Sequence, residues 1–311
     1  MPNQIKGYYL QWRPQKKTKA LLGQVNEVFE VYEDQLPLTL RQVFYILVAN
    51  YSYEKTERAY NRLGDHLNMA RRAEWIPFGY LRDDSLHGFF GGDVKSENEF
   101  WTDTKRRAKN FTLDKIANQD YKIRVHCEAV GMLPQLRRVC EPLSIPVYSC
   151  SGFDSLSVKY DLTSEIVATK TFEGKSTVIL HLGDGDPSGA SIFKDGMVAD
   201  VLAFLEVEFE DLPYWDAEDV AIFERVAMLP EQAERLGVPS APAKKGDPRS
   251  KAWGDAPTYQ LEAMPPDVLA EYLEDAIYDW LDFDQLEEDR EDEVEKRHHI
   301  LNQLRQLPAG D

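Results

Sequence analysis

Residues 176–189 read STVILHLGDGDPSG, and this stretch decides the fold. Its first part, Ser176–Leu182, is almost wholly apolar or β-branched, which is typical of a strand buried on both faces of a parallel sheet. The second part, residues 183–189, consists of Gly, Asp, Pro and Ser, which favour turns, and a helix is predicted from about residue 187 to 205. The chain therefore passes from a buried strand to a helix through an acidic turn. Open parallel sheets bind ligands at that edge.

Strand and helix patterns alternate on both sides of this stretch. In chain order they are a strand at Tyr121–Cys127, a helix at 129–141, a strand at 146–149, a helix at 154–170 and, downstream, a strand near 220–228. Strands that alternate with helices predict an α/β domain with a parallel sheet, which we place at residues 120–230.

The N-terminal part of the chain has a different pattern. Apolar residues recur at helical spacing over residues 19–34, and Thr39 with Gln42 fits a capping box that opens an apolar helix over about 43–50. A third helix is predicted over about 54–72, and the aromatic residues 75–81, with their Pro and Gly, predict short strands and a turn. Three helices followed by a small β-wing predict a winged helix-turn-helix domain at residues 1–95, a layout that places one helix in the DNA major groove.

Two further regions complete the predicted organisation. Residues 96–119 form a linker helix that carries a cluster of cationic side chains. Residues 231–311 contain a loop rich in Pro, Gly, Ala and Lys at 237–258, followed by a helical tail over about 265–305. We interpret the acidic run 287–295 (EEDREDEVE) as a solvated surface.

Charge is unevenly distributed along the chain. The 311 residues carry a formal net charge of −18, but residues 1–140 hold 22 Lys and Arg against 17 Asp and Glu. A basic half joined to an acidic half indicates a polyanion partner at one end. The sequence has no apolar run of about 18 residues and no secretory signal pattern, and its three cysteines have no zinc-ligand spacing. We therefore expect a cytoplasmic protein with buried thiols and no membrane span.

Carboxylates follow two of the predicted strands. Glu128 ends the strand at residues 121–127, and Asp184 and Asp186 follow the strand at residues 176–182. If these strands are neighbours, three carboxylates converge, and hard oxygen ligands with no nitrogen or sulfur suit Mg²⁺. Unpaired carboxylates repel one another, and a cation relieves that repulsion. The alternative is an ordinary turn, because Asp, Gly, Pro and Ser are all turn formers.

This combination resembles a Toprim domain: a Glu at the first strand end and Asp184-x-Asp186-Pro187-x-Gly189 at a later one. The fuller resemblance is to the A subunit of topoisomerase VI and its meiotic double-strand-break relatives, in which Tyr takes the place of Ser188. Residues 151–155 resemble another segment of that family. The length of the chain is similar to that of the compact stand-alone Mini-A members.

The same family has an Arg-x-x-Tyr/Phe-Tyr segment in a winged-helix domain before Toprim. Here residues 41–45 read Arg-Gln-Val-Phe-Tyr. The resemblance implies that Tyr45 attacks a DNA phosphate and becomes linked to the 5′ end. Arg41 lies four residues earlier, so both side chains share one side of a helix, where a guanidinium favours the phenolate and the developing charge. The alternative for Tyr45 is a core aromatic.

Basic side chains supply candidate DNA contacts, because cationic clusters bind phosphates. The candidates are Lys16, Lys17, Lys19, Arg58, Arg62, Arg71 and Arg72. The resemblance implies a homodimer on double-stranded DNA, in which each site pairs the tyrosine of one protomer with the metal site of the other. The sequence has no phosphate-binding loop motif for ATP, so any ATPase activity would need a separate partner subunit.

The resulting hypothesis is Mg²⁺-dependent DNA cleavage by tyrosine transesterification, as in a type IIB topoisomerase A subunit, leaving a 5′-phosphotyrosyl link. Two alternatives stay open. One is a metal-dependent hydrolytic nuclease that uses the same carboxylates and in which Tyr45 is structural. The other is a non-cutting DNA-binding component of a larger complex.

Overall fold

The computed structural model describes residues 9–82, 94–149, 156–209, 216–242, 253 and 256–306. The sequence-based expectations for Cys150 and for residues 151–155 lie outside these residues.

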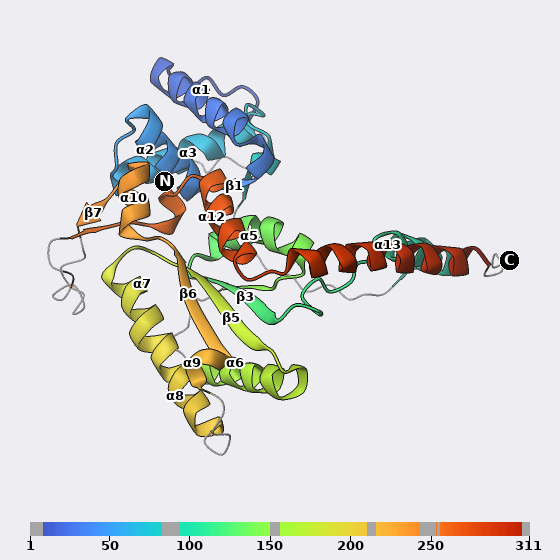
Figure 1. Ribbon diagram of the computed structural model, residues 1–311. Coiled ribbons are helices and arrows are strands. Elements are labelled where there is room, and N and C mark those ends of the chain that lie inside the picture. The colour runs from blue at the N-terminus through green and yellow to red at the C-terminus, as the bar shows by residue number, and fades with distance from the viewer. Residues whose placement is uncertain are drawn as a thin grey trace.

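A four-stranded parallel sheet forms the centre of the molecule, as the sequence predicts (Figure 1). Its strand order is β4-β3-β5-β6, and every neighbouring pair is parallel. The bounds of the strands are Tyr121–Cys127 for β3, Val147–Ser149 for β4, Ser176–Leu182 for β5 and Ala221–Ala227 for β6. The register pairs Cys127 with Leu182, so β3 and β5 end side by side.

Both faces of the sheet are covered, which explains why β5 is apolar along nearly its whole length. Val178 and Leu180 belong to one core, and Ile179, which points to the opposite face, belongs to a second. The first core is shared with α5 (Leu133–Cys140) and α12 (Pro266–Tyr278). The second core is covered by a layer made of α6 (Leu156–Ala168), α7 (Pro187–Ser191), the π-helical turn η6 (Ile192–Val198), α8 (Ala199–Glu208) and α9 (Ala217–Val220).

The N-terminal part of the described chain consists of three helices on one side of the sheet (Figure 1). They are α1 (Lys16–Val31), α2 (Leu40–Tyr51) and α3 (Glu57–Arg72). The predicted capping box opens α2: Thr39 Oγ1 accepts from Gln42 N at 3.2 Å, and Gln42 Oε1 accepts from Thr39 N at 2.8 Å. The buried Gln42 also donates to Gln135 of α5 at 2.6 Å, so the cap ties α2 to the sheet region.

The described residues do not confirm the predicted wing. Residues 75–81 were expected to form short strands and a turn, but Phe78–Tyr80 is a 3-10 helix (η2). The strand β2 has two residues, Leu81–Arg82, and it pairs in parallel with β1, Leu38–Thr39. Two exposed aromatic rings of this stretch pack against helices, which explains the difference from the predicted strands. Lys19 of α1 lies over the ring of Trp75, and Arg71 of α3 lies over the ring of Phe78.

The remaining elements are short, apart from the helices α4 and α13. They are η1 (Glu33–Gln35), α4 (Glu97–Lys109), η3 (Val130–Met132), η4 (Glu141–Leu143), the π-helical η5 (Thr169–Glu173), α10 (Pro230–Leu236), β7 (Ala241–Pro242), β8 (Pro257–Thr258), η7 (Leu261–Ala263) and α13 (Phe283–Gln306). The strands β7 and β8 are an antiparallel pair within the region predicted to be a loop.

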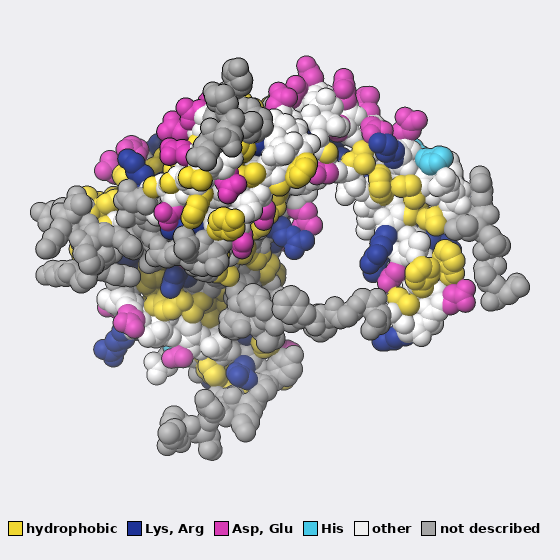
Figure 2. All heavy atoms as spheres, turned by 90° about the horizontal axis from the view of Figure 1, so that it is seen from below, with side chains coloured by type: hydrophobic (Ala, Val, Ile, Leu, Met, Phe, Trp, Pro, Cys, Tyr) yellow, Lys and Arg dark blue, Asp and Glu magenta, His cyan; other side chains and the backbone are white. Residues whose placement is uncertain are grey.

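The C-terminal helix α13 projects from the body of the molecule with α4 packed beside it (Figure 1). Figure 2 shows acidic side chains gathered along the edge of the molecule on which α13 projects. The interpretation of residues 287–295 as solvated is wrong for Asp289 and Glu293, whose residues are 4% and 8% exposed.

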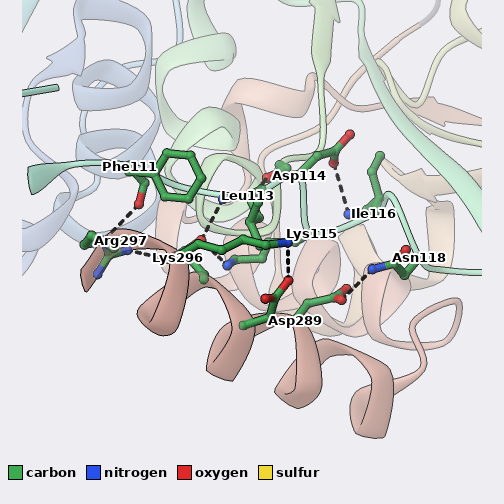
Figure 3. A network of polar contacts seen from close by, with 12 residues as sticks. Phe111, Leu113, Asp114, Lys115, Ile116, Asn118, Asp289, Lys296 and Arg297 are labelled. Atoms are coloured by element: carbon green, nitrogen blue, oxygen red, sulfur yellow. Dashed lines mark hydrogen bonds and ion pairs between the residues drawn. The ribbon is translucent and has the colours of Figure 1, made fainter. Parts of the chain in front are cut away.

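These two buried acids attach α13 to the segment before β3 (Figure 3). Glu293 forms an ion pair with Lys115 and accepts from the backbone N–H of Leu113 at 2.9 Å. Asp289 accepts from Asn118 Nδ2 at 2.6 Å. A buried charge needs a partner, and the basic and amide groups of residues 113–118 supply it.

The described cysteines, Cys127 and Cys140, are buried free thiols. Burial raises the pKa of the Cys140 thiol to about 12, which keeps it protonated and unreactive. Among the helices of the described residues, none is long and apolar enough to cross a membrane.

Candidate functional site

Glu128 and Asp184 lie together at the carboxyl edge of the sheet. Glu128 N donates to Leu182 O at 2.9 Å, which extends the β3–β5 pairing by one residue. The carboxylate of Glu128 then accepts from the backbone N–H of Asp184 through Oε2 at 3.2 Å. Two of the three predicted metal ligands are therefore held in direct contact by the ends of adjacent strands.

Each of the three predicted ligands has one oxygen fixed by a backbone amide. Asp186 Oδ1 accepts from Gly189 N at 2.7 Å, and Asp184 Oδ1 accepts from Leu261 N at 2.8 Å. The second oxygens of Asp184 and Asp186 form no hydrogen bond with the described residues. Within the part of the chain that the structure describes, no group of three or more His, Cys, Asp or Glu side chains is already gathered closely enough to hold a metal.

The second oxygen of Glu128 is the clearest sign of a missing partner. Oε1 is buried and has no hydrogen-bond partner among the described residues, and its nearest basic atom is His181 Nε2 at 3.4 Å. A buried carboxylate oxygen without a donor is costly, and a hard cation satisfies such an oxygen. The chemistry of this oxygen thus fits a hard cation such as Mg²⁺, although the three carboxylates are not gathered around one point in this structure.

Two glycines make room for this carboxylate. A Cβ placed on Gly183 would lie 2.5 Å from Glu128 Cδ, and one placed on Gly189 would lie 3.1 Å from Glu128 Oε2. The Gly189 position would also meet the backbone oxygen of Asp184 at 2.5 Å. Glycine is thus required at both positions for close approach of backbone and carboxylate.

The electrostatics of the site separate the two neighbouring acids. Burial raises the pKa of Asp184 to about 6. The hydrogen bond from the Leu261 amide lowers this pKa, whereas the nearby acids Asp186, Glu262 and Glu128 raise it further. Burial also raises the pKa of Glu128, but His181, the Asp184 amide and Arg225 outweigh it, so the pKa lies below its usual range. His181 itself is neutral, because burial lowers its pKa. At neutral pH this edge of the sheet therefore holds one ionised acid, Glu128, beside one acid, Asp184, whose pKa lies near neutrality.

Arg225 of β6 contacts the acidic turn, and the sequence patterns did not single it out. Its guanidinium donates to Asp184 O at 2.5 Å and to Gly189 O at 3.0 Å, which fixes the acidic turn. Burial lowers the pKa of Arg225, and the acids Glu128, Asp184 and Asp186 oppose that shift. The available signal was the pair of charged residues Glu224 and Arg225 within a predicted strand whose other residues are apolar.

Residues 259–262, which we call the bridging segment, join the acidic edge to α2. Tyr259 pairs with Gly185 through two backbone hydrogen bonds of 2.8 and 3.0 Å, and Leu261 N binds Asp184. Tyr259 and Leu261 are buried, whereas the alternate side chains Gln260 and Glu262 face α2. Four consecutive residues thus contact either the acidic turn or the α2 pair Arg41 and Tyr45.

Tyr45 of α2 is buried in the hydrophobic core, and its hydroxyl points toward the bridging segment. The residue is 8% exposed, its ring packs edge-on against Phe44 at 5.4 Å, and Lys55 lies over the ring at 5.6 Å. The hydroxyl donates to Gln260 Oε1. Burial raises the pKa of Tyr45 to about 12, Arg41 lowers it, and Glu262 and Asp184 raise it. The burial agrees with a core aromatic, and the charged groups nearest the hydroxyl are Arg41, Glu262 and Asp184.

Arg41 lies on the same side of α2, as the i,i+4 spacing predicts. Its guanidinium binds Glu262 Oε2 at 3.0 Å, and the two side chains are 48% and 11% exposed. Burial lowers the pKa of Arg41, but the ion pair with Glu262 outweighs it and leaves the pKa raised. In this arrangement Arg41, the cation expected to assist Tyr45, forms an ion pair with the carboxylate of Glu262.

Three of the predicted DNA-binding residues line grooves or pockets of the described chain. Lys17 and Arg62 line the same open groove of about 880 Å³ between α1 and α3, with Trp12 and His66. Arg71 lines a second, smaller pocket beside Arg41. The other candidates are not among the residues lining either space; they are Lys16, Lys19, Arg58 and Arg72.

The fold and the site together define an α/β protein with acidic side chains at the carboxyl edge of a parallel sheet. In comparisons with known proteins, no family model matches the chain, and no curated protein or solved structure matches it either.

Proposed function

We propose that this protein cleaves double-stranded DNA by Mg²⁺-dependent tyrosine transesterification, with Tyr45 as the nucleophile. The observation that carries the proposal is the bridging segment, which links Tyr45 to Asp184 within one chain. A core aromatic would need no such link to an acidic turn. The resemblance to topoisomerase VI A subunits adds to this argument, because it selects the same residues independently.

Glu128, Asp184 and Asp186 are the residues that would hold Mg²⁺. The ion would neutralise charge on the phosphodiester that reacts. Arg225 holds the acidic turn in place, and the low pKa of Glu128 keeps this ligand ionised at neutral pH.

Tyr45 performs the covalent step. Its phenolic oxygen forms a bond to the phosphorus, the bond from phosphorus to the 3′ oxygen breaks, and the 5′ phosphate remains on the tyrosine. The phenolic proton passes to solvent, and the departing 3′ oxygen takes up a proton. Arg41 assists by stabilising the phenolate and the negative charge on the phosphate, as a positioned cation does in such reactions.

The groove that contains Lys17 and Arg62 supplies phosphate contacts away from the reacting bond. A homodimer would cut both strands, and a separate ATPase subunit would supply any energy coupling. The intrachain link favours a site in which Tyr45 acts with the acids of its own chain rather than with those of a partner.

Mixing two inactive variants tests this last point. If Tyr45→Phe and Asp184→Asn proteins are combined, a site shared between protomers regains activity in the mixed dimer, because one intact pair remains. A site within one chain stays inactive in every combination, which is the result we expect. Recovery of cleavage would show that the tyrosine acts across the dimer.

The proposal is tested with supercoiled DNA and Mg²⁺, followed by denaturation and capture of protein-linked DNA. Wild-type protein should yield captured DNA, and Tyr45→Phe should yield none. The control is Tyr160→Phe, because Tyr160 is half exposed on α6, away from the candidate site, and its loss should leave capture unchanged.

The burial of Tyr45 favours one competing function, a hydrolytic nuclease in which the same acids act and the phenol is structural. Protein-free DNA ends, formed equally by wild type and Tyr45→Phe, would establish that function instead.

A further inference from the structure

A polar pocket of about 370 Å³ lies between α2, α3 and the bridging segment. Its lining includes two arginines, Arg41 and Arg71, and one acidic side chain, Glu262. Gly131, three residues beyond Glu128, also lines it, so the pocket adjoins the acidic edge of the sheet. Neither the acidic site nor the ion pair of Arg41 accounts for Arg71.

We infer that this pocket binds a phosphate group of the nucleic acid backbone, and that the phosphate takes the place that the carboxylate of Glu262 holds in this structure. The inference rests on the proposed function, since it names where that site grips its substrate. It also assigns Glu262 a role as a positioning residue that acts through Arg41.

Arg71 provides the first argument. Its guanidinium donates to Asn68 Oδ1 at 2.9 Å, but its buried Nε atom has no partner among the described residues. No ion pair with a described carboxylate neutralises its charge. Arginine presents several donors in a planar fork, which suits a phosphate, so Arg71 has unused donors on the wall of the pocket.

The ion pair of Arg41 provides the second argument. Glu262 Oε2 binds Arg41 at 3.0 Å, and Glu262 is 11% exposed, so an anion already occupies the side of the pocket where Arg41 lies. A carboxylate and a phosphate present similar oxygen acceptors to a guanidinium. A phosphate that contacts both Arg41 and Arg71 would form more charge-assisted hydrogen bonds than the single contact of Glu262.

The exchange would act directly on Tyr45. Burial raises the pKa of Tyr45, Arg41 lowers it and Glu262 raises it, so Glu262 offsets part of the effect of Arg41 on the phenol. When a phosphate pairs with Arg41, the ion pair between Arg41 and Glu262 breaks, and the phosphate lies beside Tyr45. The exchange thus couples phosphate binding at Arg41 to placement of the substrate beside Tyr45.

Binding of inorganic phosphate and of a short duplex DNA tests the inference by calorimetry without Mg²⁺. Glu262→Gln should bind both about tenfold more tightly than wild type, because one charge-assisted hydrogen bond of Arg41 becomes available. Glu271→Gln is the matched control, since this exposed acid lies on α12 outside the pocket. Equal affinities in Glu262→Gln and Glu271→Gln would overturn the inference.

A second pair of variants covers a loss of folding in Glu262→Gln. Arg71→Gln should weaken phosphate binding about tenfold, whereas Arg290→Gln, an exposed arginine on α13 outside the pocket, should not. Equal effects of these two substitutions would also overturn it. These measurements need no cleavage, so the two proposals can fail separately. Phosphate binding in the pocket without any DNA linked to Tyr45 would refute the proposed function alone. DNA linked to Tyr45 without phosphate binding in the pocket would refute only the inference about the pocket.

Discussion

Tyr45 and Asp184 are joined through two consecutive residues: the phenol donates to Gln260, and the N–H of Leu261 donates to Asp184 at 2.8 Å. This relationship brings together the proposed nucleophile and a metal-ligand candidate that belong to different parts of the sequence. The bridging segment that aligns the two residues also covers the phenol, and its Glu262 forms an ion pair with Arg41, the cation proposed to activate Tyr45.

The pH dependence of DNA attachment follows from Tyr45. Burial raises the pKa of Tyr45 to about 12, so the reactive phenolate is a minor species at neutral pH. The rate of covalent attachment should therefore rise about tenfold for each pH unit above neutrality, up to the limit of protein stability. Single-turnover trapping at several pH values measures this.

In Glu262→Gln the same profile should lie at lower pH, because a neighbouring negative charge that raises the pKa of Tyr45 has been removed. A profile that is flat with pH, or one that is unchanged in Glu262→Gln, would contradict this account of activation. Glu271→Gln again serves as the control.

Asp184 should reduce the stability of the metal-free protein. Its pKa rises from 3.8 in the unfolded chain to about 6 on folding, mainly because of burial, so its ionised form is disfavoured in the folded state. The cost is absent below about pH 4 and complete above about pH 6. Asp184→Asn should therefore be more stable than wild type near neutral pH by on the order of 1–3 kcal/mol.

Urea unfolding at several pH values measures that difference, with Asp161→Asn on the exposed face of α6 as the control. Addition of Mg²⁺ should stabilise the wild type and leave Asp184→Asn unchanged, since ligand binding stabilises only the protein that binds it. An Mg²⁺ effect of equal size in both proteins would show that Asp184 is not a ligand.

Gly183 leaves no room for a side chain. In Gly183→Ala the new Cβ would lie 2.5 Å from Glu128 Cδ, so the carboxylate must move. The Mg²⁺-dependent stabilisation should fall at least as far as in Asp184→Asn. Gly23→Ala is the control, because nothing lies within 4 Å of a Cβ there, and it should stabilise α1 by about 0.5–1 kcal/mol. Retention of the full Mg²⁺ effect in Gly183→Ala would exclude Glu128 as a ligand.

The buried pair of Lys115 and Glu293 should hold α13 in place. Glu293→Gln leaves Lys115 without its buried counter-charge, which should cost about 3 kcal/mol of unfolding free energy at neutral pH. Burial raises the pKa of Glu293, but Lys115 and the Leu113 amide outweigh it and lower the pKa below its usual range. The stabilisation is therefore complete above the unfolded pKa of about 4.3 and is lost as the pH falls below it.

The difference in stability between wild type and Glu293→Gln should accordingly narrow in acid. Glu295→Gln, an exposed acid on the same helix, should match the wild type throughout. A difference that stays constant from neutral pH to acid would mean that the ion pair does not stabilise the fold.

The strands that carry the acids could be predicted from the sequence because their signals are local. Ser176–Leu182 and Tyr121–Cys127 are the bounds of β5 and β3 in the structure, and the capping box at Thr39 is formed. A strand buried on both faces and a helix cap each depend on neighbouring residues, so one short stretch of sequence contains the whole signal.

The bridging segment could not be predicted, because no local signal marks it. Gln260 follows a region predicted to be a loop, and its contact with Tyr45 spans 215 positions of the chain. Glu293 is a similar case: an acidic run appears solvated until the structure shows that Lys115 lies opposite it. Pairings of this kind depend on tertiary packing, which a periodic pattern does not encode.

The central claim, that Tyr45 is the nucleophile, is tested most directly by locating the DNA on the protein. Wild-type protein is incubated with DNA and Mg²⁺, denatured, treated with nuclease and protease, and its peptides are examined by mass spectrometry. The account predicts a nucleotide remnant joined through phosphate to the side-chain oxygen of Tyr45. Cleaved DNA with no remnant on any peptide, or with the remnant on another residue, would contradict it.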